Sequence, residues 1–225
     1  AIGRAVDRVL TIFPFEEAIY ARAGIPATYV GHPMADSLPL VADRADARAQ
    51  LRLPAGAQAV ALLPGSRVGE LEAHADLFID TATRLAKSHP QARFFGLLAT
   101  RETREFFESR LYAREAAGLP LTILFGHARL ALQACDCALV ASGTATLEAA
   151  LARCPMVITY RVPRLTYRLM MRKALLPYVG LPNILAGEFI VPELLQDDAT
   201  PENLEQALGN WLEHKAVRER LESRF

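Results

Sequence analysis

The sequence has little cysteine and no pattern of metal ligands. Its 225 residues include three Cys, an odd number, at Cys135, Cys137 and Cys154. Sparse cysteine without metal-ligand spacing is typical of a protein in a reducing compartment. We therefore predict ordinary packed thiols, no disulfide framework and no metal site.

Neither sign of charge dominates, and no apolar segment is long. Lys plus Arg and Asp plus Glu number 25 each, which argues against a nucleic-acid partner. No apolar run approaches the ~20 residues that a membrane-spanning helix needs, and no secretory signal is visible. We expect a chain that is soluble or only peripherally attached to a membrane. Because it opens on Ala1 rather than Met, we also expect a fragment or a trimmed chain.

Two common nucleotide-binding fingerprints are missing as well. The chain contains neither G-x-G-x-x-G nor a Walker A lysine loop. Their absence counts against a nicotinamide oxidoreductase and against a P-loop ATPase.

What the sequence does contain is a series of short apolar runs that alternate with helical stretches. Each run has about five residues and is almost unbroken, which is typical of parallel strands covered on both faces. The pattern predicts an α/β fold, a Rossmann-like doubly wound parallel sheet, whose ligands bind at the carboxyl ends of the strands. The runs are Ala59–Leu63, Arg93–Leu98, Leu121–Phe125, Cys137–Val140 and Met156–Tyr160.

We predict three parts along the chain. Residues 1–40 contain two strand candidates around a helix, and we expect them to end one α/β domain and to lead into a proline-containing linker. Residues 41–200 form the Rossmann-like domain, and residues 201–225 form terminal helices. Near the end of the second part, we expect Pro192–Gln196 to begin a helix.

The main candidate site follows the run Cys137–Val140. There Ser142, Gly143 and Thr144 lead into a predicted helix, where free backbone N–H groups and a hydroxyl suit a phosphate or diphosphate. Glu148 lies four places after Thr144 on the same helix face, so its carboxylate could accept hydrogen bonds from a ribose. The alternative is that Ser142 or Thr144 only caps the helix and that Glu148 is solvated.

Two other loops follow strands of the same sheet. In the loop Gly65-Ser66-Arg67, the guanidinium of Arg67 could fork onto a diphosphate, or it could pair with Glu70 at the surface. His127 has no visible acid or metal partner, so we favour a turn residue over a catalytic base.

Two features beyond the last apolar run leave alternatives open. A basic stripe could meet an anionic lipid surface, or it could be a solvated helix face. Asn183 lies in an apolar segment and needs partners if buried, so it is either a backbone-bonding turn residue or a ligand contact. The stripe consists of Arg164, Arg168, Arg172 and Lys173, with Leu165, Leu169 and Met170 between them.

In combination, these segments resemble the motifs of bacterial lipid-A-disaccharide synthases. They occur in the family's order and span nearly the whole chain, whereas the Ser-Gly-Thr loop alone would only suggest a nucleotide-sugar enzyme. The matching segments are Phe13–Glu16, Val30–Asp36, Ala61–Arg67 with Glu70, Ser142–Glu148, Pro155–Val157 with Tyr160 and Arg161, and Leu181–Gly187.

The resemblance implies the C-terminal half of a GT-B glycosyltransferase. Such an enzyme joins UDP-2,3-diacylglucosamine to 2,3-diacylglucosamine 1-phosphate, releases UDP and inverts the anomeric centre. The family uses no nicotinamide or flavin cofactor, and it works in the cytoplasm, peripherally on the anionic inner face of the inner membrane. A homo-oligomer stays open, because nothing in the residues decides the oligomeric state.

The resemblance also assigns roles to individual residues. Ser142, Gly143 and Thr144 would contact the diphosphate, and Glu148 the ribose. Arg67, with Gly65 and Ser66 in its loop, and Asn183 match positions important for binding or activity. Gln196 is a looser match, from the Glu-Leu-Leu-Gln stretch.

No residue is a convincing catalytic base. The family's proposed base lies in the N-terminal half, of which this chain holds only the last elements. We therefore expect the chain to bind UDP weakly without turnover. The alternatives are another UDP-sugar enzyme of this architecture, such as a UDP-N-acetylglucosamine 2-epimerase or the peptidoglycan N-acetylglucosaminyl transferase, and a non-catalytic UDP-binding module.

Overall fold

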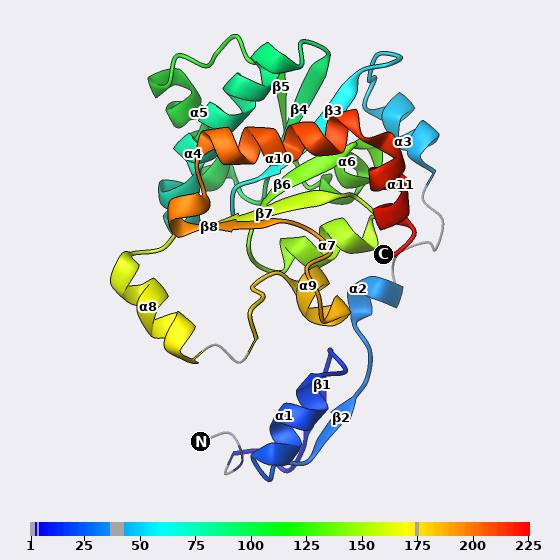
Figure 1. The fold of residues 1–225 in the computed structure, drawn as a ribbon, viewed down its shortest axis with the longest axis vertical. Coiled ribbons are helices and arrows are strands. Elements are labelled where there is room, and N and C mark those ends of the chain that lie inside the picture. Colours follow the sequence, from blue (N-terminus) through cyan, green and yellow to red (C-terminus); the bar gives the residue numbers. More distant parts are fainter. Residues whose placement is uncertain (1–2, 4, 37–42, 174–175) are drawn as a thin grey trace. The chain divides into compact units, whose positions relative to one another are not determined.

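The computed structural model describes residue 3 and residues 5–36, 43–173 and 176–225 (Figure 1). The chain divides into two compact units, Ala1–Val41 and Ala42–Phe225. Most of the predicted linker, including Pro39, lies outside the described residues. In the described part, no helix combines the length and apolar character needed to cross a bilayer.

The first unit is a small parallel β-α-β arrangement. Its helix begins where the Glu16 carboxylate accepts hydrogen bonds from the amides of Ile12 (3.1 Å) and Phe13 (2.9 Å). The two strands pair in parallel. The elements are β1 (Val9–Thr11), α1 (Glu16–Arg22), β2 (Ala27–Tyr29) and α2 (Pro33–Asp36).

The second unit is built on a six-stranded sheet in the order β5-β4-β3-β6-β7-β8. Every neighbouring pair is parallel, which confirms the predicted doubly wound fold. The central strands are apolar throughout because helices cover both of their faces, and every residue of β6 is buried. The strands are β3 (Gln58–Leu63), β4 (Ala92–Leu98), β5 (Leu121–Phe125), β6 (Cys137–Ala141), β7 (Met156–Tyr160) and β8 (Glu193–Leu195).

The helices form two layers around this sheet. One layer groups α4, α5 and α10, and the other groups α3, α6 and α7 (Figure 1). The terminal helices α10 and α11 contribute Leu204, Trp211 and Leu221 to the same hydrophobic core as the strands. The helices are α3 (Arg44–Gln50), α4 (Val68–Ser88), α5 (Arg101–Ala113), α6 (Ala128–Ala134), α7 (Ala145–Leu151), α8 (Arg164–Lys173), α9 (Leu181–Ala186), α10 (Pro201–Glu213) and α11 (Lys215–Glu222).

The predicted helix at Pro192–Gln196 is wrong. Glu193–Leu195 form the edge strand β8, and a 3-10 turn follows from Gln196 to Asp198. The strand is stabilised by pairing with Ile158–Tyr160 of β7. The Glu193 carboxylate also collects hydrogen bonds from other parts of the chain, so tertiary contacts override the local helical preference of this stretch.

The three cysteines lie in the core as free thiols, as predicted. Burial raises the pKa of Cys154 to about 12. A thiol in this environment stays protonated and packs as a small apolar side chain.

Candidate functional site

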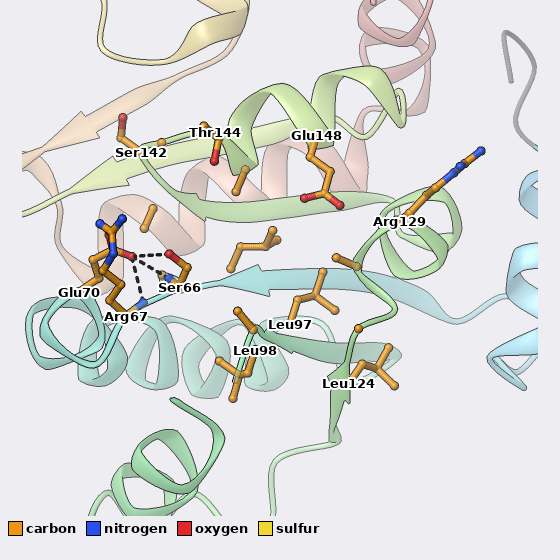
Figure 2. A pocket seen from close by; sticks show the side chains of 18 of the residues that line it. Ser66, Arg67, Glu70, Leu97, Leu98, Leu124, Arg129, Ser142, Thr144 and Glu148 are labelled. Carbon is orange, nitrogen blue, oxygen red and sulfur yellow. Dashed lines mark hydrogen bonds and ion pairs between the residues drawn. The ribbon is translucent and has the colours of Figure 1, made fainter. Parts of the chain in front are cut away.

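The strand order reverses between β3 and β6, which lie side by side in the centre of the sheet. In doubly wound folds, ligands bind in the crevice outside the carboxyl ends of the strands at such a point. A cavity of about 550 Å³ lies there. Figure 2 shows the labelled side chains around it: Ser66, Arg67, Glu70, Leu97, Leu98, Leu124, Arg129, Ser142, Thr144 and Glu148.

The loop after β6 presents open backbone amides to this cavity. Gly143 has φ +154°, a conformation that suits glycine. The amides of Gly143 and Thr144 donate to no residue that the structure describes, whereas the Ser142 amide donates to the Thr159 carbonyl at 2.9 Å. Two backbone donors at one cavity wall, without an acceptor in the described part of the chain, suit an anion.

The two hydroxyl groups of this loop do not cap helix α7. Thr144 stands at the N-cap position in helical conformation (φ −61°, ψ −25°) without a side-chain capping bond within the described chain. The Ser142 hydroxyl donates to the Val179 carbonyl at 3.2 Å, so it joins the loop to the segment before α9. The capping alternative therefore does not explain these residues.

Glu148 projects from the first turn of α7 toward the cavity (Figure 2). Its side chain is half-buried, and no described residue hydrogen-bonds or ion-pairs with its carboxylate. Burial raises the pKa of Glu148 above its ordinary value of 4.5. A partly desolvated carboxylate without a protein partner can accept hydrogen bonds from a ligand.

The loop after β3 differs, because a carboxylate already accepts hydrogen bonds from its backbone amides. Glu70 Oε2 accepts hydrogen bonds from the amides of Ser66 (2.7 Å) and Arg67 (3.3 Å). Gly65 has φ +138°, and a Cβ added there would lie 2.6 Å from the Cβ of Glu70. The Arg67 guanidinium lies 3.4 Å from Glu70 Oε1, yet its side chain is 83% exposed at the cavity rim. Both alternatives for Arg67 are thus compatible with its position.

Asn183 does not line the cavity, contrary to the idea of a direct ligand contact. It is fully buried on α9. Its Nδ2 donates to the Val191 carbonyl (2.9 Å) and to Glu193 (2.8 Å), and its Oδ1 accepts from the amides of Ile190 (2.8 Å) and Val191 (3.0 Å). Of the two alternatives from sequence, the structure shows the backbone-bonding residue.

Glu193 and Gln196 complete a hydrogen-bonded frame behind the cavity. The Glu193 carboxylate also accepts from the amides of Val179 (3.0 Å) and Gly180 (2.9 Å). Gln196 bonds both the amide (2.8 Å) and the carbonyl (2.9 Å) of Val162. Gln196 does not line the cavity, and its side-chain amide bonds the main chain instead.

The cavity lining includes residues that were not predicted from the sequence, among them Arg129 and Tyr160. Arg129 lines the cavity from the first turn of α6, and Tyr160 lines it from the end of β7. The signal for Arg129 was its place two residues after His127, at the carboxyl end of a predicted strand. His127 itself is exposed at the N-cap position of α6 and does not line the cavity.

Solved structures of similar architecture define the fold class. WaaG, a glycosyltransferase involved in lipopolysaccharide biosynthesis, matches with a TM-score of 0.60 at 15% identity, over 95% of this chain and 56% of that one. The UDP-GlcNAc 2-epimerase of Methanocaldococcus jannaschii, solved with UDP-GlcNAc and UDP, matches with a TM-score of 0.62 at 13% identity, over 93% and 55%. The fold is that of one half of a GT-B glycosyltransferase.

Sequence comparison narrows this class to one family. The family model of lipid-A-disaccharide synthetase matches residues 1–224. The lipid-A-disaccharide synthase of Aromatoleum aromaticum is 57% identical over 211 residues, covering 94% of this chain and 54% of that protein. The one from Dechloromonas aromatica is 53% identical over 225 residues, covering 100% and 59%. The chain belongs to the lipid-A-disaccharide synthetase family, and it spans little more than half the length of these relatives.

Proposed function

We propose that this chain binds the UDP moiety of UDP-2,3-diacylglucosamine within a lipid-A-disaccharide synthase. The complete enzyme would transfer the sugar to 2,3-diacylglucosamine 1-phosphate, release UDP and invert the anomeric centre. One observation carries the proposal: at the point where the strand order reverses, the open amides of Gly143 and Thr144 share a cavity with the half-buried carboxylate of Glu148.

The walls of the cavity suggest how UDP lies in it. The diphosphate would accept hydrogen bonds from the amides of Gly143 and Thr144, with the Arg67 guanidinium reaching it from the facing wall. The ribose hydroxyls would donate to Glu148. The uracil would then lie over the apolar floor formed by Leu97, Leu98 and Leu124.

This arrangement serves one half of the chemistry. Donors that are already in place can stabilise the negative charge that develops on the departing diphosphate. The acceptor hydroxyl needs a general base, and the two carboxylates of this cavity are otherwise engaged, Glu70 with its loop and Glu148 with the ribose. We therefore assign the base to the part of the synthase outside this chain, and we expect this chain to bind UDP without turnover. Residues 1–40 would then end the partner domain.

Calorimetric titration with UDP tests the binding proposal. UDP should bind more tightly than uridine, because the two open amides face the diphosphate. Glu148→Ala should weaken UDP binding by roughly 1–3 kcal/mol through the loss of hydrogen bonds to a charged acceptor. Glu102→Ala, an exposed first-turn glutamate of α5, is the matched control. Equal affinities of the parent and Glu148→Ala would show that this carboxylate does not touch the nucleotide.

Substrate preference of the complete enzyme separates the synthase from its rivals. UDP-glucosamine derivatives with short acyl chains should react faster than the acyl-free compound. A preference for the unacylated sugar would favour an epimerase-like activity, and the absence of any reaction would favour a non-catalytic UDP-binding module.

We also propose that helix α8 places the enzyme on the anionic inner face of the inner membrane. This helix has no acidic residue. Its arginines recur every four residues, and exposed leucines adjoin this stripe: Leu165 is 80% and Leu169 is 56% exposed. Guanidinium groups beside exposed leucines suit lipid phosphates above acyl chains. The side chain of Lys173, which was part of the predicted stripe, lies outside the described residues.

Sedimentation with vesicles tests this placement. Arg168→Glu combined with Arg172→Glu should reduce binding to vesicles of phosphatidylglycerol and phosphatidylethanolamine, and neither protein should bind phosphatidylcholine. The same charge reversal at Arg101 and Arg104 of α5 is the control, since both are surface residues paired within their own helix. Equal partitioning of the α8 variant and the parent would return α8 to the solvated alternative.

A further inference from the structure

A buried histidine lies directly behind two walls of the cavity. His74 is on α4, one turn after Glu70, and is 1% exposed. Its Nδ1 lies 2.7 Å from the Glu70 carbonyl oxygen, and its Nε2 lies 3.0 Å from the amide nitrogen of Arg161. Its ring stacks on Tyr160, with centroids 5.3 Å apart, and makes a T-shaped contact with Phe78, with centroids 6.3 Å apart.

These contacts select one tautomer of the imidazole. The Arg161 amide can only donate, so Nε2 must accept and carries no proton. Nδ1 then carries the proton and donates it to the Glu70 carbonyl. A second proton would place an N–H at Nε2 against the N–H of Arg161, so the geometry requires a neutral ring.

The two hydrogen bonds of the imidazole connect it to two different walls of the cavity. The Glu70 side chain holds the loop after β3 through the amides of Ser66 and Arg67. On the other side, Tyr160 lines the cavity, and Arg161 follows it where β7 ends. The imidazole is therefore a rigid spacer between the loop that carries Arg67 and the end of β7.

We propose that His74 is a positioning residue, whose neutral ring sets the distance between the Arg67 loop and the Tyr160 wall so that a nucleoside diphosphate fits. This role rests on the proposed UDP site and assigns His74 no contact with the ligand. The competing explanation is that His74 only contributes to the stability of the core. The two differ in whether its replacement changes ligand affinity in a protein that remains folded.

Three substitutions of His74 remove its two hydrogen bonds one at a time or together. His74→Gln keeps an acceptor for the Arg161 amide, His74→Asn keeps a donor for the Glu70 carbonyl, and His74→Phe keeps only the ring. In calorimetric titration, His74→Phe should lose about tenfold in UDP affinity, the loss expected when hydrogen bonds of this kind are removed. The UDP affinities of His74→Gln and His74→Asn should lie between those of His74→Phe and the parent. The affinity for UMP, which lacks the outer phosphate, should decrease less than the affinity for UDP.

The results distinguish this inference from the proposed function. A parent that binds UDP together with a folded His74→Phe that binds it equally well would overturn the positioning role and leave the UDP site intact. A parent that does not bind UDP would overturn the site, and the positioning role with it. Urea unfolding of each variant establishes that the affinities refer to folded protein.

One further measurement needs no variant, and a second needs only His74→Gln. Burial lowers the pKa of His74, and the positive charge of Arg161 acts in the same direction, while the backbone bond and the charge of Glu70 oppose it. In the ¹⁵N spectrum of the parent at pH 7, we expect a neutral His74 protonated at Nδ1; an imidazolium or the other tautomer would overturn the inference. As the pH falls and His74 becomes protonated, the ratio of parent to His74→Gln affinity for UDP should decrease, and this ratio cancels the ionisation of UDP itself. A ratio independent of pH would count against the role.

Discussion

The loops after β3 and β6 have similar backbone connections, but they differ in whether their amides are hydrogen-bonded within the described chain. Each runs from a buried strand through a glycine at positive φ into a helix, Gly65 in one and Gly143 in the other. In the first loop, Glu70 accepts the hydrogen bonds of the following amides. In the second, the amides of Gly143 and Thr144 find no partner in the described chain.

This difference shows that a strand-loop-helix connection is not by itself an anion site. Whether the loop amides remain available to an anion depends on whether a side chain of the first helical turn folds back and accepts their hydrogen bonds. Glu70 does so at the N3 position of α4, whereas Glu148 at the corresponding turn of α7 points into the cavity (Figure 2). The first loop therefore offers a side chain, Arg67, and the second offers its main chain.

The largest expected effect comes from alanine at the two glycines. Gly65→Ala combines backbone strain with a Cβ only 2.6 Å from that of Glu70, while nothing lies within 4 Å of a Cβ at Gly143. We expect Gly65→Ala to lower the free energy of unfolding by about 2–5 kcal/mol and Gly143→Ala by about 1–3 kcal/mol. Urea unfolding measures both. Equal losses would mean that Glu70 does not pack against its loop.

The next effect concerns the support of the second loop. Glu193→Ala would remove the acceptor of the Val179 and Gly180 amides and one of the two acceptors of the buried Asn183 Nδ2, which keeps the Val191 carbonyl. We expect a loss of about 1–3 kcal/mol in the free energy of unfolding. The exposed Glu188→Ala serves as the control. An unchanged denaturation midpoint would show that this frame contributes nothing to the fold.

Removal of the first loop's carboxylate should cost less. Glu70→Ala frees the amides of Ser66 and Arg67, which water can reach in part, so we expect a loss of about 0.5–2 kcal/mol in thermal or urea unfolding. Glu72→Ala, on the same helix and exposed, should leave stability unchanged. If the two variants behave alike, the contrast between the loops fails.

The smallest effect is a pH dependence at Glu148. Burial raises the pKa of this carboxyl in the folded state, so the charged form is disfavoured there and stability falls as the pH rises through the folded pKa. Glu148→Gln removes this cost, and the variant should be slightly more stable than the parent at pH 7 while it binds UDP more weakly. The stability difference should vanish below pH 4.5, the unperturbed value. A variant less stable than the parent at pH 7 would contradict the desolvated state of Glu148.

Much of this architecture could be predicted from the sequence, because buried parallel strands are apolar throughout. The five runs from Ala59 to Tyr160 became β3 to β7, and the lipid-A-disaccharide synthase motifs led to the family. Edge strand β8 could not be predicted, since its Glu193 owes its place to donors from Val179, Gly180 and Asn183. The partners of Asn183 were undecidable for the same reason, because no local pattern shows that it bonds Ile190 and Val191.

Three features could not be predicted either: the amides of the second loop and the Glu148 carboxylate have no partner among the described residues, and His74 is neutral. Each depends on what another segment does: whether a carboxylate folds back, or which atom faces an imidazole nitrogen. Spacing can place such residues at one edge of a sheet, but it does not determine which hydrogen bonds are already formed.

The link between Ser142 and Val179 has a consequence for how occupancy of the cavity would be sensed elsewhere. Through Val179 and Gly180, the loop after β6 is joined to Glu193 on the edge strand, about fifty positions further along the chain. A nucleotide that steadies this loop should therefore slow deuterium uptake at Val179 and Gly180, residues that do not line the cavity. Mass spectrometry of the corresponding peptides would then register binding at a distance, with no label on the ligand.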